Sequence, residues 1–478
     1  MKLYKLLLYC FISLAIVSSC QDDQDDVIQN VEDTETPSEF EEIKGYIMDA
    51  MKIFYVYKSD APDLADNRFE NDKEYTTFLN SIASPVDFFY SLVAPQDRFS
   101  FIVEDFIALE ESFQGISLSN GMAFGLIRYN GTNTVFGYVR YVVPDSPADK
   151  AGLKRGDIFN SIDGNVFTSE TNFGQLLAPE SYTIGMAELQ EDELVSLGQD
   201  VSLTKIQLTE NPIHEYNVID IDDQKVGYLM YNNFRRNFDS ELNGIFGEFK
   251  SEGISELILD LRYNSGGSIE TCKDLSSMIT GQFEGQVFAK QLFNENFDTE
   301  NINFDNEIYT EETINSLNLS RVFVLTTQAS ASASELLINA LNPYIDVVQI
   351  GDKTAGKFEG SVTLYDSPNY RRNNVNLEHT YAIQPLILRT ANKNGFTDFV
   401  NGLVPNIELD EDFDDLGALG DPKETLLNRA LQEISPDNTM LISKQNKSRP
   451  TEMLGENMMN TPSYQRMYVD FESLDTNE

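Results

Sequence analysis

The strongest constraint on the fold is a pattern that occurs three times in the second half of the chain. An apolar run leads at once into small or polar residues in LILDLRYNSGGS (257–268), RVFVLTTQASASASELL (321–337) and DVVQIGDKTAGK (346–357). Such runs, bounded by glycine or serine and opening helical sequence, are typical of buried strands in βαβ units. The pattern therefore predicts a mostly parallel sheet. Its small-residue loops meet at the carboxyl ends of the strands, where ligands bind in such sheets.

One of these loops holds three serines at alternate positions, Ser330, Ser332 and Ser334, just before a helix is expected to begin. A serine hydroxyl is a good nucleophile only when a base takes its proton, and the oxyanion formed on the substrate needs hydrogen-bond donors. The first turn of the helix and the glycine turn at residues 264–268 can both supply backbone N–H groups. Together the loops predict an acyl-transfer site.

Few residues are available as the base. The chain has only two histidines, His214 and His379, and neither follows a predicted strand in such a loop. A lysine can replace histidine when burial disfavours its charged form and lowers its pKa towards neutrality. The loop GDKTAGKFEG contains two lysines, Lys353 and Lys357. The residues alone leave both as candidates.

The first half of the chain has two other patterns. Between about residues 37 and 104 the apolar residues recur at helical spacing, which predicts a small helical domain. From about residue 108 to 209, short alternating runs separated by turn signals predict a β-rich domain.

Within that second region, YVRYVVPDSPADKAGLKRGDIFNSIDGNVF (138–167) resembles a PDZ domain of bacterial processing proteases. In that family the peptide adds as a strand to the edge of the sheet, and backbone N–H groups bind its terminal carboxylate. The resemblance implies that the peptide-binding stretch of this chain is Ala123, Phe124, Gly125 and Leu126.

The motifs LILDLRYNSGG, VLTTQASASASE and IGDKTAGK, in this order after a PDZ-like segment, resemble the S41 family of serine peptidases, the C-terminal processing or tail-specific proteases. The resemblance covers residues 38 to 432. It implies Ser332 as the nucleophile and Lys357, 25 residues later, as the general base. It also implies the backbone amides of Gly267 and Ala333 as oxyanion donors, and a ClpP/crotonase-like α/β core built on ββα units.

The chain departs from the family pattern just after the lysine. Many members have a glycine there and, shortly beyond, a glutamine that orients the base, whereas this chain has Phe358 and, at the expected glutamine position, Ser361. Ser361 and Gln384 are therefore the candidates for orienting the lysine. The strings LEHTYAIQPLILRT and NGLVPNIELDED resemble the lipoprotein branch of the family.

The N-terminus MKLYKLLLYCFISLAIVSSC has the layout of a secretory signal, and Val17-Ser18-Ser19-Cys20 resembles the lipobox of bacterial lipoproteins. The resemblance implies acylation of Cys20 and attachment to a membrane. The acidic QDDQDD that follows also resembles the surface-export signal of some Gram-negative lipoproteins. We therefore expect an exported Gram-negative lipoprotein at the outer membrane, on its periplasmic face or at the cell surface.

These patterns predict a multidomain α/β protein. Its expected parts are a signal peptide (1–19), an acidic tether (20–37), a helical domain (38–105), a PDZ-like domain (106–212), a peptidase core (213–435) and a polar, weakly ordered tail (436–478).

Composition excludes several classes of function. The formal net charge of −44 disfavours nucleic acid as a partner. Two histidines and three cysteines offer almost no zinc ligands, and no disulfide framework, metal or cofactor is expected. The leading hypothesis is a Ser-Lys endopeptidase acting on polypeptides. The alternatives are an inactive peptide-binding lipoprotein and, without tryptophan for stacking on sugars, a less favoured carbohydrate binder.

Overall fold

The computed structural model describes residues 40–190, 193–413, 415–436, 451–457, 459, 461 and 464–470. All of them belong to one compact unit, Glu39–Glu478. The predicted signal peptide, Cys20 and the acidic tether lie outside the described residues. None of the helices in the described ranges is long and apolar enough to cross a membrane.

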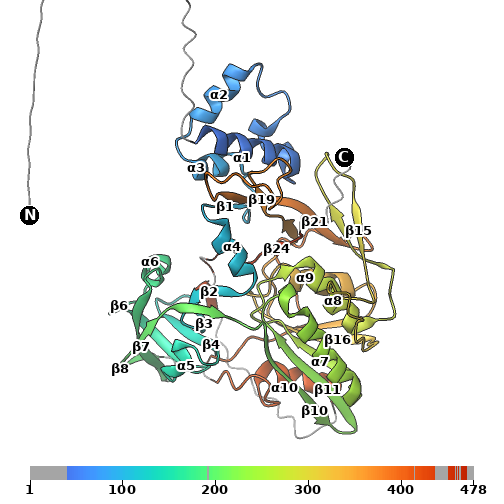
Figure 1. Cartoon of the computed structure of the whole chain (residues 1–478). Coiled ribbons are helices and arrows are strands. Elements are labelled where there is room, and N and C mark those ends of the chain that lie inside the picture. The colour runs from blue at the N-terminus through green and yellow to red at the C-terminus, as the bar shows by residue number, and fades with distance from the viewer. Residues whose placement is uncertain are drawn as a thin grey trace, which may run out of the picture. The chain divides into compact units, whose positions relative to one another are not determined.

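The N-terminal part is helical, as its apolar spacing predicts (Figure 1). Helix α1 buries Ile43, Ile47, Met51 and Phe54, which lie on one face of the helix. Asn71 caps helix α2 (Asp72–Asn80), because its side chain accepts a hydrogen bond from the backbone N–H of Glu74. The elements are α1 (Glu41–Phe54), the short 3-10 helices η1 (Lys58–Asp60) and η2 (Pro62–Leu64), α2 (Asp72–Asn80), α3 (Pro85–Leu92), β1 (Phe101–Val103) and α4 (Phe106–Phe113).

The second part is the predicted β-rich domain, an antiparallel sheet in the order β3-β4-β5-β7-β8. Ser146 caps its short helix, and Pro147 occupies the first helical position, as the Pro-Asp-Ser-Pro sequence predicts. The elements are β2 (Ile116–Ser119), β3 (Met122–Tyr129), β4 (Val135–Val142), α5 (Pro147–Lys150), β5 (Ile158–Ile162), β6 (Asn165–Val166), α6 (Phe173–Leu177), β7 (Ser181–Gln190), β8 (Glu193–Thr204) and β9 (Ile206–Thr209). Strand β2 pairs with β9 as a separate ribbon.

The core contains the predicted parallel sheet, in the order β10-β11-β12-β16-β17-β22. All neighbours are parallel except β10, which pairs antiparallel with β11. The strands are β10 (Ile213–Ile221), β11 (Gln224–Tyr231), β12 (Glu256–Asp260), β16 (Arg321–Thr326), β17 (Asp346–Gly351) and β22 (Ile407–Glu408). The helices around it are η3 (Arg236–Phe238), α7 (Asp239–Glu252), α8 (Ile269–Thr280), α9 (Ala333–Leu341) and α10 (Thr425–Ile434).

This sheet is buried on both faces, as its nearly continuous apolar strands predict. Along β11, Leu229 and Tyr231 pack with helices α7, α8 and α9, whereas Tyr228 and Met230 pack with α10. The alternation arises because successive side chains of a strand point to opposite faces. The cluster on the α7–α9 face also includes residues of α1 and α3, so the N-terminal helices share a hydrophobic cluster with the α/β core.

A second core sheet has the order β13-β24-β18-β21-β14-β15, and a smaller one has the order β1-β20-β19. The strands are β13 (Gly267–Ser268), β14 (Val287–Leu292), β15 (Glu300–Asn303), β18 (Glu359–Ser361), β19 (Leu364–Tyr365), β20 (Ala382–Gln384), β21 (Leu386–Asn392) and β24 (Met467–Tyr468). Since β1 pairs with β20, the N-terminal part is joined to the core by backbone hydrogen bonds.

One prediction requires correction. The tail from residue 436 was expected to be weakly ordered, but the described residues of this region include two strands, β23 (Thr451–Glu456) and β24. Strand β23 pairs with β3, and β24 lies between β13 and β18. Polar sequence without a clear period concealed them, because an added strand draws its stability from the partner edge rather than from its own pattern.

Candidate active site

Ser332 lies between the end of β16 and the start of α9, at the carboxyl end of the parallel sheet. Its side chain is buried, and its backbone has φ 60° and ψ −112°. Positive φ is strained for a residue with a Cβ atom and occurs where the surroundings impose it, often at functional sites. The turn thus places the serine at the N-terminus of α9, whose first N–H groups have no partner within the helix.

The other two serines of the run have structural partners. Ser330 Oγ donates to the carbonyl of Leu261 at 2.8 Å, and Ser334 Oγ donates to the carbonyl of Asn264 at 3.0 Å. Both bonds fasten the serine loop to the turn that follows β12. The hydroxyl of Ser332 also donates to a backbone carbonyl, that of Gln465 at 2.7 Å, but Ser332 alone of the three is the N-cap of α9. The choice of Ser332 as nucleophile stays a prediction.

Lys357 lies in the loop between β17 and β18 and is only 2% exposed, whereas Lys353 is exposed. Burial lowers the pKa of Lys357 from 10.5 to about 7, although nearby carboxylates such as Glu359 oppose the shift. Its Nζ lies 4.3 Å from the centre of the Phe99 ring, which the N-terminal part supplies. Of the two candidate lysines in this loop, Lys357 has the buried environment that a lysine base needs.

Glu335 connects the nucleophile loop to the lysine loop. Its Oε2 accepts the backbone N–H groups of Ser332 at 2.8 Å and Lys357 at 2.9 Å. Its Oε1 accepts from the N–H of Gly356 at 2.7 Å and the hydroxyl of Thr354 at 2.5 Å. Burial raises the pKa of this carboxyl to about 7, against the effect of these four hydrogen bonds. Sequence reasoning assigned Glu335 no role, although it ends the motif SASASE.

The glycine turn presents an amide to the same site. Gly267 has φ 135°, and a Cβ atom here would lie 2.2 Å from the carbonyl oxygen of Phe234, so only glycine fits. Its N–H donates to the carbonyl of Arg466 at 2.7 Å. Ala333 is the first residue of α9, beside Ser332. The two predicted oxyanion donors therefore belong to the turn and the helix start that border the serine.

Ser361 and Gln384 lie together, but the structure does not connect them to the lysine by a hydrogen bond. Ser361 Oγ donates to Gln384 Oε1 at 2.9 Å, and Arg466 Nε donates to the same oxygen at 3.1 Å. Within the described ranges, neither side chain bonds to Lys357 Nζ. Their predicted role in orienting the base stays a prediction.

The residues predicted to bind peptide, Ala123 to Leu126, lie in β3, between β4 and β23. The N–H of Phe124 donates to the side-chain oxygen of Asn457 at 3.1 Å. A cavity of about 860 Å³ opens beside this strand, lined among others by Gly121 and Met122. The edge predicted to receive a peptide strand is thus paired with a strand of the same chain.

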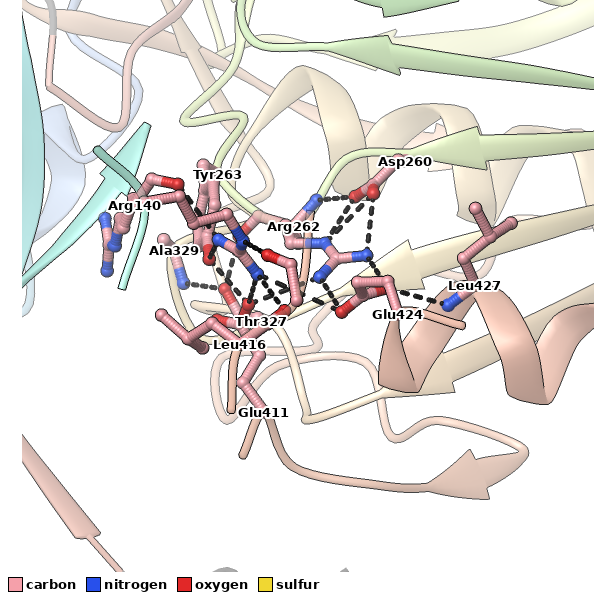
Figure 2. Close-up of polar contacts among 12 residues, drawn as sticks. Arg140, Asp260, Arg262, Tyr263, Thr327, Ala329, Glu411, Leu416, Glu424 and Leu427 are labelled. Carbon is pink, nitrogen blue, oxygen red and sulfur yellow. Dashed lines mark hydrogen bonds and ion pairs between the residues drawn. The ribbon is translucent and has the colours of Figure 1, made fainter. Parts of the chain in front are cut away.

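A buried ionic network joins the β-rich domain to the turn that carries Gly267 (Figure 2). Arg262 is fully buried and pairs with Asp260 at 2.8 Å and with Glu424 at 2.7 Å. Glu411 pairs with Arg155 of the β-rich domain at 2.9 Å. Burial would raise the pKa of Glu411, but Arg155 and Arg262 lower it to about 2. The network fixes β12 and its following turn relative to the β-rich domain.

The histidines do not belong to the site. His214 packs on the ring of Tyr141, and His379 Nε2 lies 2.9 Å from Asp366 Oδ2. Neither is bonded to a serine of the run among the described residues. The part of the chain that the structure describes contains no group of three or more histidine, cysteine, aspartate or glutamate side chains that could hold a metal ion.

The α/β fold places a buried serine and a buried lysine in loops at the ends of parallel strands, and acyl transfer by a serine-type peptidase requires these residue types. Comparison of the sequence with models of known protein families agrees with this class. Residues 225–383 match the Peptidase family S41 model, residues 138–184 match a PDZ domain, and residues 42–101 match the Peptidase S41 N-terminal domain. By these matches the chain is similar to S41 family peptidases that carry a PDZ domain and an S41 N-terminal domain.

Individual relatives show the same likeness. The chloroplastic C-terminal processing peptidase of Tetradesmus obliquus is 25% identical over 48% of this chain and 50% of its own. The carboxyl-terminal-processing protease of a Picosynechococcus species is 26% identical over 45% of this chain and 49% of its own. The chain thus spans about half the length of these relatives. A solved structure from Bacteroides fragilis, assigned to the S41 proteases, is 27% identical with a TM-score of 0.64, over 82% of this chain and 97% of that one.

Proposed function

We propose that the chain is an endopeptidase that cleaves extended polypeptides through Ser332 and Lys357. The observation that carries the proposal is the carboxylate of Glu335, one oxygen of which accepts the backbone amides of both residues. A single rigid group therefore holds nucleophile and base loops together. The lowered pKa of Lys357 makes its neutral, proton-accepting form available near neutral pH.

In the proposed reaction, neutral Lys357 takes the proton of Ser332 Oγ as that oxygen bonds to the carbonyl carbon of the substrate. The carbonyl electron pair moves onto oxygen, where the N–H groups of Gly267 and Ala333 stabilise the charge. The C–N bond then breaks, and the lysine ammonium returns the proton to the departing amine. Water, deprotonated by the same lysine, then attacks the acyl carbon, and the lysine returns that proton to Ser332 Oγ as the bond between this oxygen and the acyl carbon breaks.

Matched substitutions test this assignment. The proteins are the chain lacking residues 1–20, which keeps the compact unit Glu39–Glu478, and its Ser332→Ala and Lys357→Ala variants. We expect both variants to lose about a thousandfold or more of the hydrolysis rate on an unfolded protein. The control Lys353→Ala, at an exposed lysine of the same loop, should keep the hydrolysis rate of the parent. Absence of hydrolysis by every protein, the parent included, would favour the alternative of an inactive peptide-binding lipoprotein.

A substrate that replaces β23 on the edge of β3 would bind as an added strand and be recognised near its C-terminus. The test compares cleavage of one peptide with a free and with an amidated C-terminus. A lower KM for the free form supports the proposal, and equal kinetics contradict it.

We also propose that the chain is a lipoprotein of the family's lipoprotein branch, anchored through Cys20 to the outer membrane of a Gram-negative cell. The motif Val17-Ser18-Ser19-Cys20 supports this. Fatty-acid labelling that Cys20→Ser abolishes would verify the anchor, and labelling unchanged by that substitution would exclude it. Protease treatment of intact cells distinguishes the cell surface from the periplasmic face.

A further inference from the structure

The described residues of the segment 451–470, which are 451–457, 459, 461 and 464–470, follow the path that the proposed function assigns to a substrate. Its first part, β23, pairs antiparallel with β3, from Thr451 opposite Tyr129 to Glu456 opposite Gly125. Asn457 extends the pairing by accepting from the N–H of Phe124 and donating its own N–H to the Phe124 carbonyl. The peptide-binding edge of the PDZ domain is therefore covered by this chain.

The second part of the segment lies in the catalytic centre. The carbonyl of Gln465 accepts the hydroxyl of Ser332 at 2.7 Å, and the carbonyl of Arg466 accepts the N–H of Gly267 at 2.7 Å. Strand β24 follows directly and pairs in parallel with β13. Two consecutive carbonyls of the segment thus accept hydrogen bonds from the Ser332 hydroxyl and the Gly267 amide, the groups that would act on a substrate carbonyl.

This arrangement is unproductive for cleavage. A reacting carbonyl must be approached by Ser332 Oγ at its carbon while its oxygen is held by the oxyanion donors. Here the hydroxyl contacts Gln465, whereas the Gly267 amide holds Arg466, the next residue. The Ser332 proton is also donated to the Gln465 oxygen and not to Lys357. The segment therefore has the geometry of an inhibitor rather than of a substrate.

The segment is held at both ends by ion pairs at the protein surface. Glu452 pairs with Arg128 of the PDZ domain, and Asp470 pairs with Arg236 of the core. Both acidic side chains are close to half exposed, and surface pairs of this kind contribute little each. They are points where docking can be weakened without touching the catalytic residues.

The middle of the segment carries a feature that opposes docking. Arg466 is only 3% exposed, and the described residues place no carboxylate in an ion pair with it. Its Nε donates to Gln384, its Nη1 has no partner among them, and its guanidinium stacks on Phe113 and Tyr468. A buried charge without a counter-ion is unfavourable. The segment is therefore bound in a way that a better ligand can displace.

We propose that residues 451–470 are an intramolecular inhibitor that covers the PDZ edge and Ser332 until a polypeptide substrate displaces it. The inference rests on the proposed function, because inhibition presupposes hydrolysis by Ser332. The inference has a second part, that the segment and an external peptide compete for the same binding path. This part rests on the pairing geometry alone and does not require hydrolysis.

The test uses a release variant, Glu452→Lys with Asp470→Lys, which places like charges against Arg128 and Arg236. The matched control is Glu170→Lys with Glu193→Lys, two exposed acids elsewhere with the same change in net charge. All are made in the chain lacking residues 1–20. We expect the release variant to hydrolyse an unfolded protein at least tenfold faster than the parent and the control, which corresponds to about 1.4 kcal/mol of lost docking free energy.

A synthetic 451–470 peptide provides a second readout. It should inhibit the release variant in trans and stay intact, and fluorescence anisotropy should show that it binds the release variant more tightly than the parent. Equal hydrolysis by parent and release variant would overturn the inference, as would cleavage of the peptide or of the parent within the segment. Absence of hydrolysis in every protein would refute the proposed function. In that case, preferential peptide binding by the release variant would still support occupancy, and equal binding would refute it.

Discussion

The burial of Lys357, the proposed base, should destabilise the protein, and this effect can be measured. In the folded chain its pKa is about 7, against an ordinary value of 10.5. Between these values the unfolded chain binds more protons than the folded one, so the stability of the parent rises with pH across this window. Below about pH 7 Lys357 is protonated in both the folded and the unfolded chain, so the free-energy penalty of burying its ammonium group is constant and at its largest.

The size of the penalty follows from the two pKa values. Linkage gives about 4 kcal/mol at pH 7, about 2 kcal/mol at pH 9 and less than about 0.5 kcal/mol near pH 10.5. The Phe99 ring beside the ammonium offsets about 0.5–2 kcal/mol of this. The substitution Lys357→Met keeps the length of the side chain and removes its charge. It should therefore stabilise the protein by about 2–4 kcal/mol at pH 7, and abolish hydrolysis.

The assay is urea denaturation of the parent and Lys357→Met at several pH values from about 6 to 10, with Lys353→Met as the exposed control. The difference between parent and Lys357→Met should be constant below pH 7 and shrink steadily above it. A difference that does not change with pH, or a less stable variant at pH 7, would refute the claim that a buried ammonium is destabilised here. The control should match the parent throughout.

Four further outcomes are expected. The kcat/KM for peptide hydrolysis should rise with pH up to about 7 and then level off, because only neutral Lys357 accepts the proton; a profile that is flat below pH 7 would contradict a lysine base. Glu335→Gln should lower the free energy of unfolding by about 1–3 kcal/mol in urea, since its amide nitrogen would face a backbone donor; unchanged stability would contradict the bridging role. Gly267→Ala should reduce kcat about a hundredfold, because its methyl group meets the Phe234 carbonyl and displaces the oxyanion donor; near-normal kcat would exclude this amide from the reaction. Arg262→Met should lower the free energy of unfolding by about 3–5 kcal/mol, since its carboxylate partners stay buried without their counter-ion; a smaller loss by calorimetry would show that the network contributes little.

The prediction of the parallel sheet from sequence succeeded for a local reason. Strands β12, β16 and β17 are buried on both faces, so their apolar runs are nearly continuous and end at small residues. The N-terminal helices and the PDZ domain were also predictable, because helix caps and turns depend on residues close in sequence. Examples are the N-caps Ser84 and Ser146 and the turn Asp163-Gly164.

The roles of Glu335, Phe99 and Arg466 were not predictable in this way. Each acts on the site through a contact that spans a long stretch of chain, such as Phe99 with Lys357 or Arg466 with Gly267. No local periodicity records which distant residue will pack against a loop. The strands β23 and β24 escaped prediction for the same reason, since their pairing partners supply most of what orders them.

By itself, the sequence determined the class of fold, the order of the domains and a short set of candidates for the chemistry. The tertiary structure decided among those candidates. It bonded Ser330 and Ser334 to carbonyls of the turn after β12 and Ser332 to the carbonyl of the distant Gln465, and it buried Lys357 while exposing Lys353. The physical reason is that strands, caps and turns depend on neighbouring residues, whereas burial, pKa and hydrogen-bond partners depend on which distant segments fold together.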